Sequence, residues 1–341
     1  MNKTFSIAVI IPTLNEERFI AQCLDSVLEQ TYPIQLMDIM VIDGGSTDKT
    51  CNIVDDYHKK YSNIRLLHNP KRIQSVAFNI GVANSTSPYV IRLDAHAIYN
   101  KTYIENCINI YSANADVLGF APELLGNVGG VCSIRPQHSG IIPEAAALLN
   151  SSKFGIGGAA FRVGVYAGVV DTVPFGCFPR KVIEQVGGMR EDLPRGEDNE
   201  YNSRIRKAGY KIYLDPEIVC TYFARDTIKS NMKQMYNNGV SIGHLAYIDR
   251  DAIGLRHLVP LIFVLGLLFG AVISIIWHPF GWIYLNGIST YLLCALFAAI
   301  HACKERSSKY ILPLVVLFAC VHVSYGVGTI VGIVHGLRTK S

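Results

Sequence analysis

Two residues, Asp94 and His96, have side chains that can bind a divalent cation. They follow the apolar run 88–93 and stand two positions apart, so in an extended chain both side chains point to the same side. A carboxylate and an imidazole suit Mg²⁺ or Mn²⁺, and the imidazole favours Mn²⁺. The alternatives are that Asp94 only forms a turn and that His96 is an ordinary loop histidine.

A second candidate for chemistry is the acidic pair Glu197-Asp198, which precedes a helix predicted from Asn199 to Ala208, with Gly209 after its end. Asp198 could cap this helix, because aspartate is common at that position. It could also be a general base that removes the proton of a hydroxyl group, with Glu197 as the alternative carboxylate. The residues by themselves leave both interpretations open.

The elements that must position these residues alternate between strands and helices. Apolar runs predict strands at 5–11, 37–42, 64–68 and 88–93, and helical spacing predicts helices at 17–30, 47–61 and 76–83, the second capped by Ser46 or Thr47. Such alternation is typical of an α/β fold with a mostly parallel, doubly wound sheet. Ligands of such sheets bind beyond the carboxyl ends of the strands. Polar clusters follow three of these ends, at 13–16, 43–45 and 94–96.

The rest of the chain changes character twice. Residues 119–188 are rich in glycine, which favours loops and close backbone approach over a long helix. Residues 225–250 are expected to form an amphipathic segment that leads to a membrane. Three nearly uncharged spans follow, at 258–277, 280–300 and 310–335, each long enough to cross a bilayer. Buried core helices are the alternative.

Composition excludes several classes of protein. Apolar residues make up 50% of the chain and charged residues 17%, which is more apolar than a typical soluble domain. The nine cysteines are scattered without a CxxC pair, so neither a structural zinc site nor a disulfide framework is expected. A net charge of +4 gives no argument for nucleic acid. The apolar run Ile7 to Ile11 is too short for a signal-peptide core.

An ordered set of short motifs gives the chain a family resemblance. They are Pro12-Thr13-Leu14-Asn15-Glu16-Glu17, Val41-Ile42-Asp43-Gly44-Gly45-Ser46-Thr47-Asp48, Asn79-Ile80-Gly81-Val82-Ala83, Arg92-Leu93-Asp94-Ala95-His96, Glu197-Asp198-Asn199-Glu200, Tyr222-Phe223-Ala224-Arg225 and Gln234-Met235-Tyr236-Asn237-Asn238-Gly239, followed by the apolar spans. In this order they resemble family 2 glycosyltransferases of the GT-A fold, and in particular bacterial glucosyltransferases of succinoglycan biosynthesis.

The resemblance implies roles for single residues. Asp94 and His96 would form a DxH variant of the family's metal-binding DxD motif, with Asp94 also at the donor diphosphate, and Asp198 would be the catalytic base. The nucleoside pocket would be lined by Pro12, Leu14, Glu16 and Asp43, although Asp43 could instead only form its turn. Arg180 and Arg204 could neutralise donor phosphates, or they could be solvated surface arginines.

The implied activity is inverting transfer from a UDP-sugar, such as UDP-glucose, with Mn²⁺ or Mg²⁺ as cofactor. The acceptor would be a polyprenyl-diphosphate-linked saccharide in exopolysaccharide, capsule or surface glycan assembly, or polyprenyl phosphate itself. Residues 1–250 would form a cytoplasmic GT-A domain, and 258–335 a multi-pass domain in the plasma membrane, with oligomerisation left open. The QxxRW motif of processive synthases is missing at 202–206, which favours addition of one sugar per acceptor. A non-catalytic scaffold or transporter subunit is the alternative from another class; Asp94, His96 and Asp198 argue against it.

Overall fold

The computed structural model describes residues 5–163, 166–193 and 195–339. The chain divides into two compact units. Unit 1 comprises the described residues of Met1–Ser133 and Gly164–Tyr222, and unit 2 those of Ile134–Val163 and Phe223–Ser341. Unit 2 therefore joins the apolar C-terminal segment to two stretches that the sequence groups with the N-terminal domain. The division into a catalytic domain 1–250 and a membrane domain 258–335 stays a prediction.

The strands form one nine-stranded sheet. They are β1 (Ile7–Thr13), β2 (Met37–Asp43), β3 (Ile64–His68), β4 (Tyr89–Arg92), β5 (Ala97–Tyr99), β6 (Leu125–Pro136), β7 (Gly168–Val170), β8 (Cys177–Pro179) and β9 (Lys211–Ala224). Their order across the sheet is β3-β2-β1-β4-β8-β6-β9-β5, and β7 pairs with β9. Every residue of β1 is buried, as expected for a central strand covered on both faces.

The predicted α/β fold is confirmed, and the sheet is mixed. Strands β1 to β4 pair in parallel, so that Thr13 and Asp43 are paired at one edge of the sheet. The pairs β4–β8, β8–β6, β5–β9 and β7–β9 are antiparallel. Parallel neighbours need a long crossover connection, usually a helix, and the clear strand–helix alternation of the sequence ends near residue 93.

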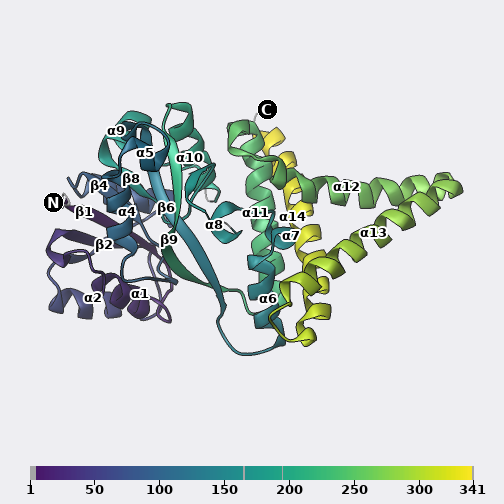
Figure 1. Ribbon diagram of the computed structural model, residues 1–341, viewed down its shortest axis with the longest axis horizontal. Helices are drawn as coiled ribbons and strands as arrows, with labels where there is room; N and C mark the ends of the chain where they lie inside the picture. The colour runs from purple at the N-terminus through teal and green to yellow at the C-terminus, as the bar shows by residue number, and fades with distance from the viewer. Residues whose placement is uncertain (1–4, 164–165, 194, 340–341) are drawn as a thin grey trace. The chain divides into compact units, whose positions relative to one another are not determined.

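Helices connect and cover the strands of unit 1 (Figure 1). They are α1 (Ile20–Leu28), α2 (Thr50–Lys60), α3 (Gln74–Ala83), α4 (Tyr103–Tyr111), α5 (Ala115–Leu118), α9 (Arg180–Val186) and α10 (Glu197–Lys207), with the 3₁₀ turns η1 (Ile34–Leu36) and η2 (Pro122–Leu124). The three predicted helices are confirmed, but the predicted cap of the second is wrong. The cap position of α2 is Lys49, because the Ser46 side chain binds Asp43 instead.

Glycine in the 119–188 segment allows close backbone approach, as predicted, although part of this segment is a long strand and not a loop. A Cβ atom added at Gly130 in β6 would lie 1.7 Å from the Ile218 carbonyl oxygen of β9. No larger residue fits at this point unless the strands separate.

Unit 2 is helical. Its helices are α6 (Ile141–Ser151), α7 (Lys153–Ile156), α8 (Ala160–Val163), α11 (Ile228–Ile248), α12 (Leu255–Ile276), α13 (His278–Ala302) and α14 (Ile311–Thr339), with the 3₁₀ turns η3 (Arg250–Ala252) and η4 (Ser308–Tyr310). Residues of α6, α13 and α14 share an apolar core that contains Leu149, Ala299 and Phe318. The segment predicted to be amphipathic, 225–250, is mostly the single helix α11.

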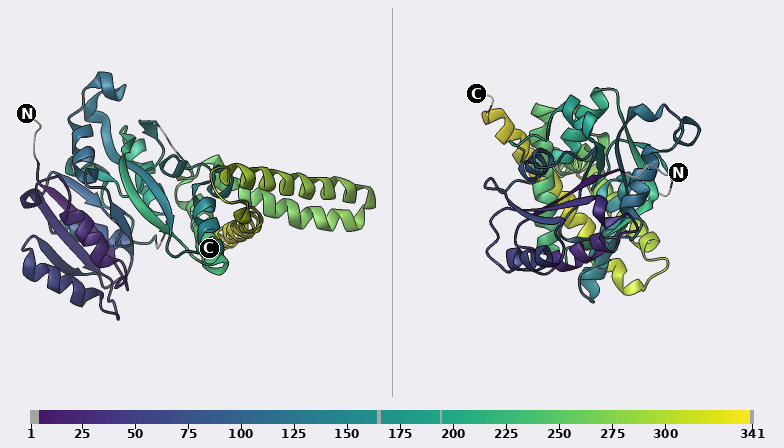
Figure 2. Two further views of the ribbon diagram at one scale, coloured as in Figure 1. Left: turned by 60° about the horizontal axis from the view of Figure 1, so that its bottom comes forward. Right: turned by 90° about the vertical axis from the view of Figure 1, so that its left-hand side faces the viewer.

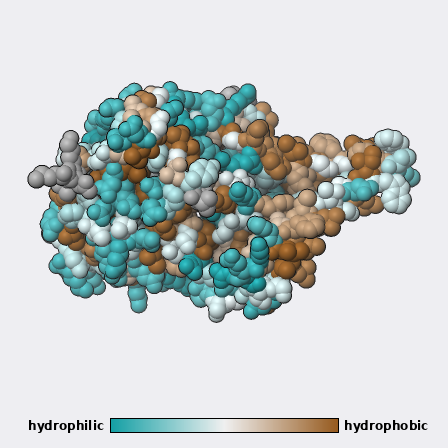
Figure 3. All heavy atoms as spheres, in the orientation of Figure 1, coloured by the Kyte–Doolittle hydropathy of each residue, from teal (hydrophilic) through white to brown (hydrophobic). Residues whose placement is uncertain are grey.

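Three helices of the described chain are long and apolar enough to cross a membrane: Leu255–Ile276, His278–Ala302 and Ser308–Leu337. Only 11% of the apolar window of each of the first two is buried, against 44% in the third. Such exposure excludes a core-helix explanation for α12 and α13. Apolar side chains also cover much of the visible face of unit 2 in Figure 3, and this surface fits a membrane.

Candidate active site

Asp94 lies in the turn that follows β4, and buried side chains hold its backbone. The Asp94 N–H donates to the Tyr99 hydroxyl oxygen at 2.6 Å, and the Tyr99 hydroxyl donates to the Asp94 carbonyl at 3.2 Å. The Cys23 thiol donates to the same carbonyl at 3.5 Å. Tyr99 and Cys23 are both fully or nearly fully buried. The position of the Asp94 carboxylate is therefore set by three separate elements, β4, β5 and α1.

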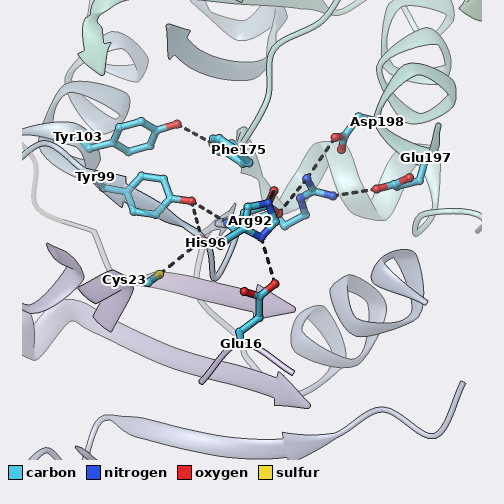
Figure 4. Close-up of polar contacts among 10 residues, drawn as sticks. Glu16, Cys23, Arg92, His96, Tyr99, Tyr103, Phe175, Glu197 and Asp198 are labelled. Carbon is cyan, nitrogen blue, oxygen red and sulfur yellow. Dashed lines mark hydrogen bonds and ion pairs between the residues drawn. The ribbon is translucent and has the colours of Figure 1, made fainter. Parts of the chain in front are cut away.

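Arg92, the last residue of β4, is the centre of a buried charged cluster (Figure 4). One terminal nitrogen of its guanidinium group lies 3.1 Å from a Glu197 carboxylate oxygen. The other lies 3.2 Å from Asp198 Oδ2 and 3.5 Å from Asp94 Oδ1. Burial by itself would lower the pKa of Arg92, but the carboxylates of Asp198, Asp94 and Glu197 outweigh it and raise this pKa. Arg92 therefore remains charged and links the two predicted site carboxylates through one nitrogen.

The N-terminus of α10 supplies the other side of this cluster. The cap position is Gly196, with φ of 84°, a left-handed conformation that glycine adopts without strain. The helix begins at Glu197, so Asp198 is its second residue, and the interpretation of Asp198 as the helix cap is wrong. The positive end of the helix dipole favours the carboxylates of its first turn, which include Glu200 as well.

Asp198 has a perturbed proton affinity. Burial raises the pKa of its carboxyl most strongly, Arg92 lowers it, and Glu197 and Asp94 raise it, with the result that the pKa is about 7. About a third of the side chain, 34%, is exposed. A carboxylate that is partly exposed and has a pKa near neutrality can accept a proton from a bound hydroxyl group.

His96 and Glu16 join Asp94 on the other side of Arg92. His96 Nδ1 lies 3.2 Å from Glu16 Oε1, and His96 Nε2 lies 3.9 Å from Asp94 Oδ2. The imidazole ring also packs edge-on against Tyr222, with centroids 5.6 Å apart. His96 is therefore held in the carboxylate cluster and is not an ordinary loop histidine. The structure thus brings Glu16, Asp94, His96 and Asp198 together.

The carboxylate cluster offers some of the ligands that a divalent cation needs. In residues 5–163, 166–193 and 195–339, no group of three or more His, Cys, Asp or Glu side chains is arranged to hold a metal ion. Asp94 Oδ1 is buried near Arg92 and accepts no hydrogen bond from any described residue, whereas Oδ2 faces His96 Nε2 at 3.9 Å. Three carboxylates surround one guanidinium group, and a cation would balance the excess negative charge. Asp94 and His96 thus fit two of the ligands of an ion whose other ligands come from a bound substrate.

The predicted nucleoside pocket has mixed support. Pro12 is buried in β1, and Leu14 is 41% exposed just beyond it. Asp43 accepts hydrogen bonds from the backbone N–H groups of Gly45 (2.8 Å) and Ser46 (3.0 Å). Burial would raise the pKa of Asp43, but its hydrogen bonds with Ser46 and Gly45 lower it overall. Asp43 therefore forms its own turn, and its contact with a nucleoside stays a prediction.

Arg180 and Arg204 lie outside the carboxylate cluster. Arg180 donates from Nε to the Ser87 carbonyl at 2.7 Å and from a terminal nitrogen to the Val82 carbonyl at 3.3 Å. Arg204 forms a two-point ion pair with Glu200, at 2.6 and 3.0 Å. It also donates to the carbonyls of Val186 and Gly188, both at 2.8 Å. Both side chains fix neighbouring backbone segments, and their predicted role in donor binding stays a prediction.

Sequence reasoning missed the two residues that organise the site, Arg92 and Tyr99. A signal was present for Arg92, since it is the one charged residue of the run 88–93. It also stands two positions before Asp94, so both can lie on the same side of the strand. Tyr99 carries no comparable signal, because its partner is the Asp94 backbone and any buried strand can contain a tyrosine.

Comparison with known proteins identifies the family. Residues 8–136 match the model of the family described as glycosyl transferase family 2. A dolichyl N-acetyl-alpha-D-glucosaminyl phosphate 3-beta-D-2,3-diacetamido-2,3-dideoxy-beta-D-glucuronosyltransferase from Methanococcus voltae is 31% identical over 94% of this chain and 95% of its own length. The succinoglycan biosynthesis protein ExoA of Rhizobium meliloti (strain 1021) is 29% identical over 79% of this chain and 78% of its own.

The fold has a counterpart among solved structures. A mannosyltransferase from Pyrobaculum calidifontis, in complex with GDP-Man and Mn²⁺, superposes with a TM-score of 0.58 over 95% of this chain and 87% of its own, at 20% identity. At this identity the likeness concerns the fold, and it agrees with the predicted GT-A class. Together with the family model and the full-length relative, it shows that the chain belongs to glycosyltransferase family 2 and is a glycosyltransferase.

Proposed function

We propose that the chain transfers one sugar from a UDP-sugar to a polyprenyl-linked saccharide by a single displacement that inverts the sugar carbon. The observation that carries this proposal is the position of Arg92, one nitrogen of which contacts both Asp94 and Asp198. A carboxylate that could hold the donor diphosphate through a cation and a carboxylate that could accept the proton of an acceptor hydroxyl thereby belong to one site.

Asp198 is the catalytic base in this proposal. Its carboxylate takes the proton of the acceptor hydroxyl as the oxygen attacks the sugar carbon, while the bond from this carbon to the nucleoside diphosphate breaks. A pKa of about 7 supports the role, because the carboxyl is substantially ionised near neutral pH and still basic enough to accept a proton. Glu197 is a poorer candidate for the base, since it is buried, whereas about a third of the Asp198 side chain is exposed.

Asp94 and His96 would hold Mn²⁺ or Mg²⁺, with Glu16 orienting the imidazole through Nδ1. When bound, the cation would supply Lewis-acid stabilisation of the leaving diphosphate. Support comes from Asp94 Oδ2, which faces His96 Nε2 at 3.9 Å, and from the Mn²⁺ bound by the Pyrobaculum protein of the same fold.

Pro12, Leu14, Glu16 and Asp43 would line the donor nucleoside site at the ends of β1 and β2. Leu14 supports this assignment, because a leucine that is 41% exposed beside a polar cluster offers an apolar surface to a base. Arg204 can bind donor phosphates only if it exchanges Glu200 and its two carbonyl partners for phosphate oxygens. Arg180 has one buried terminal nitrogen that forms no hydrogen bond with any described residue.

A lipid-linked acceptor is supported by two observations. The Methanococcus voltae relative, which matches nearly the full chain, is named for transfer to a dolichyl-linked sugar phosphate. The apolar helices of unit 2 fit a membrane, where such acceptors reside. The name of the Rhizobium relative supports a role in exopolysaccharide or other surface glycan assembly. Bare polyprenyl phosphate is the second candidate acceptor, and it requires no saccharide primer.

The proposed location is the plasma membrane, with unit 1 in the cytoplasm. This orientation is supported by Arg250 before α12, Arg256 in its first turn, and Lys304, Arg306 and Lys309 after α13, because lysine and arginine concentrate on the cytoplasmic side of membrane helices.

The decisive experiment measures sugar release from a panel of nucleotide sugars by the purified full chain, with and without Mn²⁺, and transfer to polyprenyl-linked acceptors. We expect metal-dependent turnover of a UDP-sugar and transfer to a lipid-linked saccharide. Turnover of a different nucleotide sugar would refute the UDP assignment, and undiminished turnover in the presence of a chelator would refute the metal. Transfer to bare polyprenyl phosphate alone would favour the second candidate acceptor.

A further inference from the structure

Helix α14 exposes one continuous apolar stripe. Large apolar side chains on its surface are spaced by multiples of about one helical turn, and they include Leu312, Val316, Val323, Val327 and Val334. The other side of α14 contributes Leu314, Leu317 and Phe318 to the core of unit 2. The exposed stripe runs nearly the whole length of the helix, so its extent alone fits either a membrane-crossing helix or one that lies flat on a membrane.

Helix α11 decides between these two cases, because it packs along α14 with direct backbone contact. A Cβ atom added at Gly239 would lie 2.1 Å from the Tyr325 carbonyl, and one added at Gly332 would lie 2.1 Å from the Val240 carbonyl. Near the helix ends, Gly336 packs against the Tyr247 ring. Residue numbers rise together in these contacts, so the two helices run parallel. Because α11 packs along the second half of α14, the two must lie at the same depth in a membrane.

Helix α11 is too polar for the interior of a bilayer. It is not one of the three helices of the described chain that are apolar enough to cross a membrane. Lys229 and Lys233 are exposed on it. Tyr236 lies against Gly328, and Lys233 is about one turn earlier, so Lys233 is level with the middle of α14. If α14 crossed the bilayer, this lysine would stand near its centre, where charged side chains are costly.

The pair α12 and α13 is arranged differently. Figures 1 and 2 show the two helices running side by side away from α14 and across its direction. The half of the hairpin nearest α14 packs against it: Pro260 lies against Gly326, the Tyr291 hydroxyl is 2.9 Å from His322 Nδ1, and Ala299 lies in the core with Leu317. The opposite end of the hairpin carries Trp277 and Trp282, which are 57% and 73% exposed. Tryptophan is enriched where membrane helices meet the headgroups.

We propose that α12 and α13 enter the membrane as a hairpin and that α14 lies flat in the membrane surface, with its stripe from Leu312 to Val334 against the lipid. The chain then crosses the bilayer twice and not three times. Both termini are on the same side, and α11 lies at the surface with its lysines in contact with water and headgroups.

The charge distribution supports this arrangement independently. Between Arg256 and Lys304 the sequence contains no lysine or arginine, so the hairpin tip carries none. With two crossings, Arg338 and Lys340 are on the same side as every other lysine and arginine of the chain. With three crossings these two residues alone would be on the far side, against the usual bias of such residues.

The number of crossings can be tested with three full-length variants that carry one epitope each: before Met1, between His278 and Pro279, or after Ser341. Protease protection is measured in intact spheroplasts and in inverted vesicles. We expect the first and last epitopes to be accessible from the same side and the tip epitope from the other. A C-terminal epitope on the opposite side from the N-terminal one would overturn the proposal.

Depth measurements test the flat orientation of α14 directly. The chain has only two tryptophans, Trp277 and Trp282, so a Trp277→Phe/Trp282→Phe background allows single tryptophans at Val316, Val323 or Val334. Quenching by lipids brominated at different depths should place all three at one shallow depth, whereas a crossing helix would separate the outer two by about 27 Å along its axis. As a matched control in α12, Val259→Trp, Leu268→Trp and Ile276→Trp should show a progression of depth. A similar progression in α14 would refute the proposal.

Discussion

The carboxylate cluster of unit 1 and the α11–α14 contact of unit 2 are both largely buried, but different interactions hold them: charged groups in the cluster, and close backbone packing in the helix contact. Around Arg92, charged atoms meet and some remain unsatisfied: Arg92 Nε and Asp94 Oδ1 are buried and form no hydrogen bond with any described residue. Between α11 and α14, glycines bring the two backbones into close contact. Unsatisfied buried polar atoms are costly, so these two atoms, beside the partly exposed Asp198 carboxylate, mark a place where a ligand is expected. The helix contact, by contrast, indicates a scaffold.

This difference implies that substitutions in the cluster should lower the rate of sugar transfer more than the stability of the fold. The largest effect is expected at Asp198. Asp198→Asn keeps the size of the side chain and removes the base, so transfer should fall about 10³-fold, in the range typical of general bases. UDP binding should stay within a few-fold. The measurement is steady-state transfer together with calorimetric UDP binding. Asp56→Asn, on an exposed aspartate of α2, is the control, and near-native turnover of Asp198→Asn would show that another group is the base.

Asp94→Ala should produce the next largest effect, on binding. A proposed ligand of the cation and donor is lost, so Mn²⁺-dependent affinity for UDP should fall by about 10- to 100-fold or more, since even outer-shell partners of metal ligands contribute that much. Affinity measured with a chelator present should hardly change. Equal affinity of variant and parent in Mn²⁺ would remove Asp94 from the cation site.

The scaffold side of the comparison is tested by glycine substitutions. Gly328→Ala places a Cβ atom 2.1 Å from the Tyr236 carbonyl oxygen, and overpacking of this kind costs about 1 to 3 kcal/mol. We expect a lower thermal midpoint in detergent and unchanged kcat for the molecules that remain folded. Gly266→Ala, in α12, meets no atom within 4 Å among the described residues and should leave the midpoint unchanged. If both variants behave alike, close packing does not stabilise this contact.

The smallest expected effect is a shift in pH dependence. Asp198 must be ionised to act as a base, so kcat/KM should fall as pH decreases through about 7, the pKa of this carboxyl. Glu197 raises that pKa, and Glu197→Gln should therefore move the acidic limb to lower pH. Arg92→Lys retains the positive charge that lowers the pKa of Asp198. The acidic limb of its pH profile should therefore not move to higher pH, even if kcat falls. If the acidic limb of the pH profile does not move in Glu197→Gln, the group that titrates is not Asp198.

Much of the fold was predictable because it depends on local patterns. The alternation of apolar strands and helices up to residue 93, and the three uncharged helices, follow from periodicity and run length. The antiparallel half of the sheet was not predictable in the same way. Strands such as β8 are three residues long and pair with β4 across a separation of almost ninety residues, a pairing that no local pattern specifies.

The candidate site shows the same division. The sequence alone determined the residue types, the DxH spacing and the position of carboxylates beyond strand ends, because these depend on alternation along a strand and on the parallel order of β1, β2 and β4. Only the tertiary structure decided that Arg92 joins Asp94 to Asp198, that Arg180 and Arg204 bind carbonyls instead, and that a polar helix lies along α14. Each of these depends on contacts between segments far apart in the chain, and their energies come from burial and charge that exist only after folding.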